Sequence, residues 1–536
     1  MATIVYENLN NAWKNTCRAV LGEEIGELKD YEEWLSEYIP QTRIEKSAIS
    51  GKPVTLAIPD YGKNAGFISS DEIQVGKSFE PLNINEIKDI DSIVEAVQER
   101  ILYAGNVILG NSASVEKSSN VIDSRYVYNC SSITSDSKYI AYCDSTREAE
   151  YEFGCYSCGG SSHAIKCTEG FTVKRGFESH GAHLTSDAYY SHSVESCSGT
   201  IFCFGSMNKR NAIGNLELSM DKYQEIKKKL LSEIVDIIKK EKRIFSLLEI
   251  IEKSGVCGDK RENSAREPVR FDKSRIDNAF SFTTQLLFNK ELELDSCTKL
   301  LKKHIPENIY LKSPISSKET VVGSFLARLF DRYDMRHRTL PRDEIRQIGN
   351  SSIPVEKIEK LRMDDINTLI SNLADIAFAC FDTKLGRNSN IARIALIADC
   401  ESCYEGSAYI SSKKSAYNYW LKGSESIFGS SAMWYSSFCI NCYWSKKIQR
   451  SFEVDSSESC SNVYFLHNCE NVHDSMFCFN AKNLRNAIGN AVLSPQGYKK
   501  VKAIIVGQLA TELERKGNLE VDIYNVGSIQ KQSHTH

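Results

Sequence analysis

The sequence lacks the segments that would send a chain out of the cytoplasm or into a membrane. Its first eight residues have neither a basic start nor an apolar run, so we expect no signal peptide. No stretch approaches the roughly 20 consecutive apolar residues that a membrane-spanning helix needs. These absences predict a soluble, cytoplasmic protein that does not contact membranes.

The chain also lacks a large excess of charge and the short motifs of common enzyme classes. Its formal net charge is −4 and its pI is near 6.3, which excludes a global basic field for nucleic acid. It has no phosphate-binding loop, no Gly-x-Ser-x-Gly elbow and no His-Glu-x-x-His. The neighbouring carboxylates Asp364 and Asp365 do not face one another on a helix. We therefore lean toward a non-enzymatic protein, with a β-helix carbohydrate-active enzyme as an alternative.

Cysteine, in contrast, is abundant, with 18 residues. A large chain without an export signal is not expected to be a disulfide scaffold. The cysteines gather in two tracts, among Ser, Tyr and Phe. Because a reduced thiol is a small, readily buried group, we predict that most of them are reduced and fill a core.

The strongest signal is an internal repeat. Residues 203–227 align without gaps on residues 478–502, and 13 of the 25 pairs are identical. The identical pairs are Cys203/Cys478, Phe204/Phe479, Asn208/Asn483, Arg210/Arg485, Asn211/Asn486, Ala212/Ala487, Ile213/Ile488, Gly214/Gly489, Asn215/Asn490, Leu218/Leu493, Ser219/Ser494, Tyr223/Tyr498 and Lys227/Lys502. A duplicated module of this kind builds a larger architecture without naming a chemistry.

The tracts before each repeat predict stacked strands. Short β-prone runs end in cysteine, and Cys143, Cys155 and Cys167 are 12 residues apart. In the second tract the spacings are 18 and 9 residues, as between Cys460, Cys469 and Cys478. Regular spacing of this kind favours a β-solenoid (parallel β-helix) whose interior is filled by ladders of Cys, Ser and Asn. Antiparallel hairpins stay open as the alternative.

Helical patterns surround these tracts. Residues 6–40 and the stretch from Ile358 to Ile376 have apolar side chains at helical spacing. Ser219 and Ser494 occupy expected N-cap positions, and Pro495 suits the first turn. We predict an α+β protein with these segments: a helical N-terminal region with an extended linker (1–105), a first solenoid module with its trailing helix (106–244), a helical connector (245–385), a second module with its trailing helix (386–526) and a disordered tail (527–536).

The segment from Phe477 to Asn490 resembles a cysteine-rich β-helix repeat family of microbial and viral genomes. In that family the end of the ladder reads Cys-Phe-x-x-x-x-Asn-Lys/Arg-x-Cys/Ala-Ile-x-Asn, and a helix containing tyrosine follows. The match covers about residues 120–240 and 400–515. The resemblance implies the fold and the duplication, and it supplies no catalytic residues. Family members often have Cys at the positions of Ala212 and Ala487, so a thiolate site at that place is absent here.

One cluster has metal-ligand spacing. Cys155-x2-Cys158-x4-His163-x3-Cys167 is one residue shorter before its last cysteine than a zinc knuckle that binds single-stranded RNA. The alternative is that the cysteines belong to the 12-residue ladder and His163 lies at a turn. Two further half-sites are Cys400-x2-Cys403 and Cys439-x2-Cys442, followed by His467, Cys469 and His473.

Two other groups invite a functional interpretation. His180, His183 and His192 lie near Glu178 and Asp187, which suits a hydrolytic or metal site, although histidines on a surface loop are the commoner explanation. The predicted helix after the first repeat is rich in lysine, with residues that could contact RNA: Lys227, Lys228, Lys229, Lys239, Lys240 and Lys242.

Our leading hypothesis is a structural or assembly protein without a cofactor that forms a homo-oligomer. A zinc-dependent or basic-helix factor associated with RNA or a ribonucleoprotein particle is the second hypothesis. The junction residues Cys203, Arg210, Asn211, Gly214 and Asn215, with their counterparts Cys478, Arg485, Asn486, Gly489 and Asn490, should end each module and seat the helix that follows. We predict a positive φ or a close backbone contact at Gly214 and Gly489.

Overall fold

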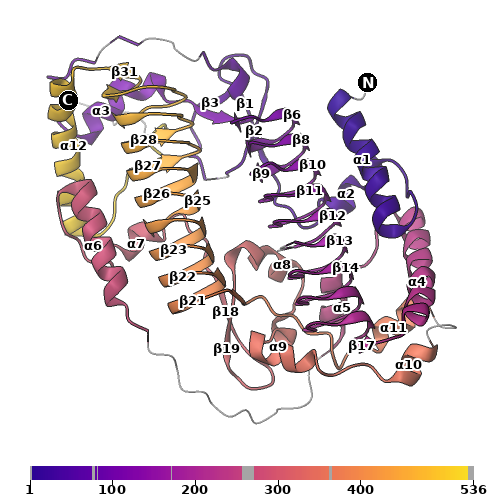
Figure 1. Ribbon diagram of the computed structural model, residues 1–536. Helices are drawn as coiled ribbons and strands as arrows, with labels where there is room; N and C mark the ends of the chain where they lie inside the picture. The colour runs from indigo at the N-terminus through magenta and orange to yellow at the C-terminus, as the bar shows by residue number, and fades with distance from the viewer. Residues whose placement is uncertain are drawn as a thin grey trace. The chain divides into compact units, whose positions relative to one another are not determined.

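The computed structural model describes residues 3–58, 60–74, 79–80, 82–168, 170, 172–255, 271–360 and 365–528 (Figure 1). The fold is α+β. Residues 256–270 of the predicted connector and most of the predicted tail 527–536 lie outside the described residues. No helix within the described ranges is long and apolar enough to cross a bilayer. The chain divides into two compact units: unit 1 comprises Met1–Gln41, Ile108–Arg266 and Ile309–Thr383, and unit 2 comprises Thr42–Val107, Glu267–Asn308 and Lys384–His536.

Unit 1 contains a ten-stranded ladder in the order β17-β16-β15-β14-β13-β12-β11-β10-β8-β6. Neighbouring strands are parallel except β16 and β17, and from β10 to β16 each residue pairs with one twelve positions later, as Lys138 does with Glu150. The strands are β6 (Ala113–Glu116), β8 (Arg125–Tyr128), β10 (Lys138–Ala141), β11 (Glu150–Phe153), β12 (Ser162–Ile165), β13 (Lys174–Phe177), β14 (Ser186–Tyr189), β15 (Ser198–Ile201), β16 (Arg210–Ile213) and β17 (Leu216–Glu217). A small sheet of β5 (Ile108–Leu109), β7 (Ser119–Ile122) and β9 (Ser131–Ile133) accompanies them.

Unit 2 contains the corresponding ladder, in the order β20-β21-β22-β23-β24-β26-β27-β28-β29-β30-β31, with β25 paired to β23 and β26. Its parallel neighbours are also offset by twelve residues, as Ser437 and Gln449 are. The strands are β20 (Thr383–Leu385), β21 (Ser389–Ala398), β22 (Glu401–Ile410), β23 (Lys413–Lys422), β24 (Glu425–Phe428), β25 (Ser431–Trp434), β26 (Ser437–Lys446), β27 (Gln449–Asp455), β28 (Ser461–His467), β29 (His473–Met476), β30 (Ala487–Ile488) and β31 (Ala491–Val492).

A three-residue rhythm produces the twelve-residue offset. The backbone has positive φ at every third residue over long stretches, as at Tyr139, Tyr142, Ser145, Glu148 and Tyr151. Each such residue turns the chain, so four turns separate residues that pair. Asn, Ser, Asp and Gly tolerate this conformation best, and the tracts are rich in them.

Small side chains fill the interior of the ladders, also at every third position. The Cys143 thiol donates to the carbonyl oxygens of Ala141 (3.3 Å) and Glu152 (3.5 Å), and it accepts the N–H of Cys155 at 3.3 Å. Serines repeat this pattern, and every cysteine that the structure describes is free and buried. The thiols therefore act as core residues that also satisfy backbone groups. The spacing of nine in the second tract reflects the step from a thiol to the carbonyl that it contacts, as from Cys460 to Cys469.

The helices follow the predictions in part. The trailing helices α4 (Met220–Glu241) and α12 (Pro495–Lys516) begin after the predicted N-caps, and the Ser494 hydroxyl accepts the N–H of Gly497. The single helix predicted over 6–40 is wrong: α1 (Ile4–Leu21) ends at Gly22, where φ is 93°, before a 3-10 turn (Leu28–Tyr31) and α2 (Glu32–Leu35). The stretch 358–376 contains α10 (Val355–Lys360) and α11 (Ile366–Ser371), because Asp365 is extended and caps α11. The remaining helices are α3 (Ile90–Val97), α5 (Leu247–Lys253), α6 (Ser274–Phe288), α7 (Thr298–Leu301), α8 (Ala327–Arg332) and α9 (Arg342–Ile348).

The duplication extends well beyond the repeat that the sequence shows most clearly. Hairpin β1 (Arg43–Lys46) and β2 (Pro53–Leu56) has a counterpart in β18 (Ile309–Lys312) and β19 (Glu319–Val322). Both turns read Lys-Ser-x-Ile-Ser-x-Lys. In each, the first serine hydroxyl donates to a glutamate, Ser47 to Glu72 and Ser313 to Glu344, both at 2.5 Å. The chain therefore consists of two homologous halves, residues 1–255 and 271–528.

The two halves exchange equivalent segments. Residues 42–107 precede the first ladder in sequence but belong to unit 2, and residues 309–383 precede the second ladder but belong to unit 1. In Figure 1 the indigo-to-purple β3 (Phe67–Ser69) and α3 accordingly lie beside the yellow end of the second ladder. We call these ranges the first and second exchanged segments. The segments predicted as a separate N-terminal region (1–105) and connector (245–385) thus each contribute to both units.

Candidate functional site: matched seats on the two ladders

The identical asparagines of the repeat close the ends of the ladders. Asn215 accepts the N–H of Phe204 at 2.8 Å and donates to its carbonyl oxygen at 3.0 Å. Asn490 makes the same pair with Phe479, at 3.0 and 2.7 Å. The side-chain amide therefore supplies the donor and acceptor that a further strand would supply. This arrangement blunts an edge that would otherwise recruit another strand.

The identical glycines form the contact between ladder end and exchanged segment. Gly214 and Gly489 both have φ of 54°, which confirms the predicted positive φ. A Cβ atom at Gly214 would lie 2.5 Å from Ile353, and one at Gly489 would lie 2.4 Å from Val97. The Gly214 carbonyl accepts the N–H of Ile353 at 3.0 Å. The Gly489 carbonyl accepts from the Arg100 guanidinium at 2.8 Å.

The other junction residues lie in the last strands of each ladder and the turns beside them. The thiols of Cys203 and Cys478 face the carbonyl oxygens of Ala212 (3.5 Å) and Ala487 (3.9 Å). Asn211 and Asn486 both have positive φ, at 50° and 53°. Arg210 and Arg485 are both exposed. Arg210 is the first residue of β16, and Arg485 pairs with His473 in a parallel bridge.

Two further identical residues seat the trailing helices. The Lys227 ammonium lies 4.4 Å from the Tyr189 ring centroid, and the Lys502 ammonium lies 5.1 Å from that of Tyr464. Burial lowers the pKa of both lysines. The hydroxyls of Tyr189 and Tyr464 donate to carbonyls of α1 and α6, those of Val20 (2.8 Å) and Leu287 (2.6 Å). One tyrosine on each ladder thus fastens two helices.

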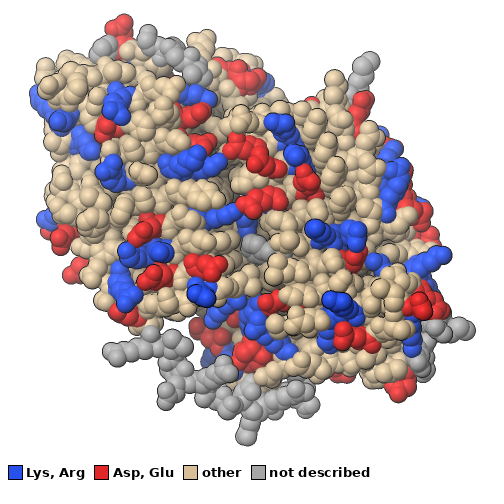
Figure 2. Space-filling model, in the orientation of Figure 1, with Lys and Arg blue, Asp and Glu red and all other residues tan. Residues whose placement is uncertain are grey.

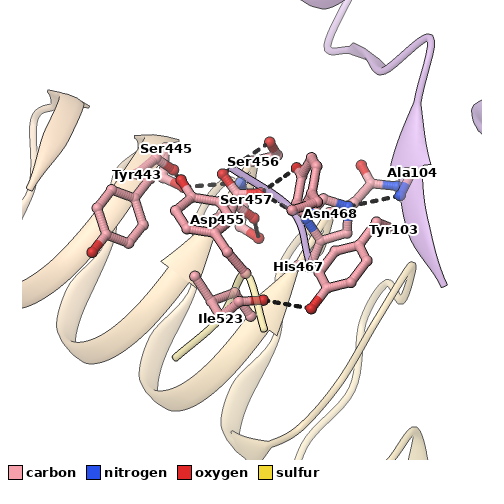
Figure 3. A network of polar contacts seen from close by, with 12 residues as sticks. Tyr103, Ala104, Tyr443, Ser445, Asp455, Ser456, Ser457, His467, Asn468 and Ile523 are labelled. Carbon is pink, nitrogen blue, oxygen red and sulfur yellow. Dashed lines mark hydrogen bonds and ion pairs between the residues drawn. The ribbon is translucent and has the colours of Figure 1, made fainter. Parts of the chain in front are cut away.

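A buried histidine on each ladder receives the exchanged segment. In unit 2, His467 Nδ1 lies 2.7 Å from the Asp455 carboxylate, and its Nε2 accepts the N–H of Ala104 at 2.8 Å (Figure 3). The Tyr61 hydroxyl also donates to Asp455, at 2.9 Å. Burial, followed by the charge of Asp455, holds the pKa of Tyr61 well above its usual value.

His192 does the same in unit 1. Its Nδ1 contacts the carbonyl oxygen of His180 at 3.1 Å, and its Nε2 accepts the N–H of Cys380 at 2.9 Å. Burial lowers the pKa of His192 to about 4, so the ring is neutral at pH 7, as an accepting Nε2 requires. The interpretation of His180, His183 and His192 as surface loop residues is wrong, because all three are buried. They pair in parallel bridges of the ladder, His180 with His192 and His183 with Glu195.

A buried glutamate on each ladder makes another pair of equivalent contacts. Glu178 accepts the N–H of Leu247 at 3.3 Å, and Glu453 accepts the N–H of Ile523 at 2.8 Å. Glu178 also pairs with buried Lys166 at 3.2 Å. Burial raises the pKa of Glu178, and it raises that of Glu453 to about 7. These carboxyl groups hold the chain that follows each trailing helix.

The residues of the predicted zinc site are divided between two faces of one ladder. Cys155, Cys158 and Cys167 are buried inside, and the Cys158 thiol donates to the Cys167 carbonyl at 2.7 Å. The His163 ring lies half-buried outside, stacked on Tyr151 with centroids 4.7 Å apart. The structure thus does not bring the imidazole to the three sulfurs, and zinc binding stays a prediction. A different trio, Cys143, Glu152 and Cys155, has ligand-type atoms within 4.8 Å of one another.

The lysines of α4 largely engage neighbouring groups. Lys229 pairs with Glu233 (3.3 Å), Lys239 with Glu23 (2.7 Å) and Lys240 with Glu241 (2.8 Å). Lys242 lies over the Tyr31 ring, and Lys228 is exposed. Figure 2 shows basic and acidic side chains interspersed over the visible face. RNA binding by this helix stays a prediction.

The sequence contains a signal for the matched buried Glu, Tyr and His residues that were not predicted. Glu178/Glu453, Tyr189/Tyr464 and His192/His467 are all separated by the 275 residues that separate the recognised repeats. Extending that alignment toward the N-terminus finds them as isolated identities within tracts that have otherwise diverged. In comparisons with known proteins, no family model matches the chain, and no curated protein or solved structure shows a significant match.

Proposed function

We propose that each ladder is a β-solenoid with twelve residues and four turns per coil. The constant offset between parallel strands and the positive φ at every third residue support this class. Like side chains also stack at strand spacing on the outside. Tyr126, Tyr139, Tyr151 and His163 form one column with centroids 4.7 to 4.8 Å apart, and Phe465 stacks on Phe477 at 4.8 Å.

We further propose that the protein is a non-enzymatic structural or assembly protein that associates with copies of itself. The observation that carries this proposal is the use made of the buried histidine and glutamate that the two ladders share. Both ring nitrogens of His192 and of His467 are engaged in holding backbone or a neighbouring carboxylate. Glu178 and Glu453 likewise hold backbone N–H groups. A general base needs a nitrogen or oxygen free to reach substrate, whereas these groups fix the fold.

Exposed apolar residues on the outer faces of the ladders suit self-association. Leu184 is 66% exposed in unit 1, and Tyr435 is 52% exposed in unit 2. Single exposed residues of this kind are ordinary, so the proposal needs a direct test. Light scattering behind size exclusion should give a dimer or larger species at micromolar concentration.

A matched set of variants sharpens that test. Leu184→Asp and Tyr435→Asp should shift the protein toward the monomer, because a charge on an apolar contact opposes association. Ile4→Asp changes a more exposed apolar residue, in α1 and 78% exposed, and should leave the mass unchanged. A monomeric mass for the unmodified protein at micromolar concentration would reject the self-association proposal.

A further inference from the structure

We propose that the two halves of the chain recognise each other as the subunits of a segment-swapped dimer do, so that the peptide connection between them is not needed to hold them together. The interaction surface on each half is the end of its ladder. The partner that fits this surface is the exchanged segment of the other half. This inference concerns contacts within the chain and does not depend on the scaffold role proposed above.

The first argument is that one interface occurs twice. The backbone N–H of Cys380, in the second exchanged segment, binds His192 at 2.9 Å, and that of Ala104, in the first, binds His467 at 2.8 Å. Equivalent positions of the two halves therefore meet in both units. Reciprocal contact of this kind is the property of an isologous, twofold interface.

The second argument is that both halves build one hydrophobic core in unit 2. Buried side chains of the first exchanged segment belong to the same cluster as buried side chains of the second ladder. The first group includes Val54, Leu56, Tyr61, Ile93, Val97 and Tyr103, and the second includes Phe428, Phe452, Tyr464, Phe477 and Ile488. Burial of apolar side chains is a main source of stability in a folded protein, so separating the halves would expose part of a hydrophobic core to water.

The third argument is a close backbone contact in unit 1. A Cβ atom at Gly205 of the first ladder would lie 1.9 Å from the carbonyl oxygen of Ile345 in the second exchanged segment. Gly349 of that segment is equally close to Gly205, with a Cβ 2.0 Å from its carbonyl oxygen. Two glycines, one from each half, thus allow the two backbone segments to come into contact, and a side chain at either glycine would push the segments apart.

The test is to cut the connection in the folded, full-length protein. A specific protease site is placed between Gly255 and Phe271, and the protein is cleaved after purification. We expect the two fragments to elute together, at the mass of the uncut protein, and to separate only when denaturant unfolds the units. Elution of separate fragments in native buffer at micromolar concentration would overturn the proposal.

Paired glycine variants show whether the ladder end is the recognition surface. Gly205→Ala introduces a methyl group against Ile345, and in the cleaved protein it should cause the fragments to dissociate at least tenfold more readily. Gly181→Ala is the matched control, since φ is also positive there (61°, against 65° at Gly205). Among the described residues, the added Cβ atom would come no closer than 3.7 Å to any other residue, and its nearest neighbour is Ser193 of the same ladder. This variant should leave the fragments associated. Equal dissociation by both variants would contradict the assigned surface.

A milder variant covers the case in which Gly205→Ala does not fold. Arg100→Met keeps an unbranched apolar side chain of similar width and removes the hydrogen bond of the guanidinium group to the Gly489 carbonyl. In the cleaved protein it should weaken fragment association several-fold, measured by dilution, while circular dichroism of the uncut variant stays unchanged. Unaltered association of Arg100→Met fragments would count against the matched interface in unit 2.

Discussion

The two units hold an exchanged segment with the same acceptor but support that acceptor differently. His467 is supported by the Asp455 carboxylate at 2.7 Å, and His192 by the His180 carbonyl oxygen at 3.1 Å. Both keep Nε2 as the acceptor of a backbone N–H. The supporting group has changed between the halves while the accepted hydrogen bond has stayed, which indicates that the contact with the exchanged segment is the constrained property.

The ladder interiors differ at one position that matters energetically. Unit 1 places Glu152 inside β11, fully buried, where the register of unit 2 places Ile427 in β24. Neither carboxylate oxygen of Glu152 has a hydrogen-bond partner among the described residues. Burial raises its pKa to about 8. The ladder interior of unit 1 therefore has a titrating group at a position where the interior of unit 2 has an apolar side chain.

The largest expected effect on stability comes from replacing Gly214 or Gly489. Gly214→Val and Gly489→Val each place a β-branched residue at φ of 54° and drive it into a side chain of the exchanged segment. Strain and overpacking together should cost about 3–5 kcal/mol of unfolding free energy in the affected unit. Denaturant titration measures this, with Gly507→Ala in α12 as control, because a Cβ atom there would meet no atom of the described residues within 4 Å. A loss below about 1 kcal/mol in either glycine variant would contradict the close contact.

The next effect separates the ladder interiors. Because the folded state holds the Glu152 proton more tightly than the unfolded chain, its contribution to stability falls as pH rises from about 4.5 to 8. Glu152→Gln should remove this loss and stabilise unit 1 at pH 8 by up to about 4 kcal/mol. The gain should vanish near pH 4. Ile427→Gln in unit 2 should instead destabilise at every pH, and a pH-independent effect of Glu152→Gln would disprove the assignment.

Acid should act on unit 1 through His192. Its folded pKa of about 4 lies below the unfolded value, so the stabilising neutral ring is fully present above about pH 6.5 and is lost as pH falls toward 4. This histidine should account for a loss of about 3 kcal/mol over that range. Comparing unfolding of the unmodified protein and of His192→Gln between pH 7 and 4 isolates the contribution. Parallel pH profiles for the two proteins would refute it.

A smaller effect is expected from the asparagines that end the ladders. Asn215→Ala and Asn490→Ala each remove a donor and an acceptor from one backbone residue. Each should cost about 2 kcal/mol. The loss should be somewhat larger for Asn215→Ala, because the Asn215 side chain also accepts from the Ser206 hydroxyl at 2.9 Å and donates to the Ile348 carbonyl oxygen at 3.3 Å. Denaturant titration of both variants measures the two losses, with the exposed Asn367→Ala as control. A loss in one unit only would show that the second asparagine does not close its ladder.

The smallest effect should come from the lysines over the tyrosine rings. Lys227→Met and Lys502→Met keep the packing of the aliphatic stem and remove the charge. Each should lower stability by about 1 kcal/mol or less. Thermal unfolding at low and high salt measures the change, and an effect that salt abolishes completely would assign it to surface ion pairing instead of the ring contact.

The parts of the fold that depend on local repetition could be predicted from the sequence. The spacing of Cys155 and Cys167 predicts the twelve-residue offset between strands, and the identical glycines predict the positive φ at the end of each ladder. The exchange of residues 42–107 and 309–383 could not be predicted. Because the two halves are homologous, the sequence offers each exchanged segment a related ladder in either half. The choice depends on tertiary contacts such as that of Ala104 with His467. The burial of His192 and His467 could not be predicted for the same reason, since it depends on the exchanged segment that covers each histidine.

Crosslinking across the exchange tests the central claim most directly. Asn85 of the first exchanged segment contacts Lys500 of α12 at 3.3 Å, and both are exposed. Asn85→Asp should give a zero-length carbodiimide crosslink to Lys500, identified by mass spectrometry within a single chain and abolished by Lys500→Arg. The account predicts this bond between the first and second halves. A crosslink from residue 85 to lysines of the first half alone would contradict it.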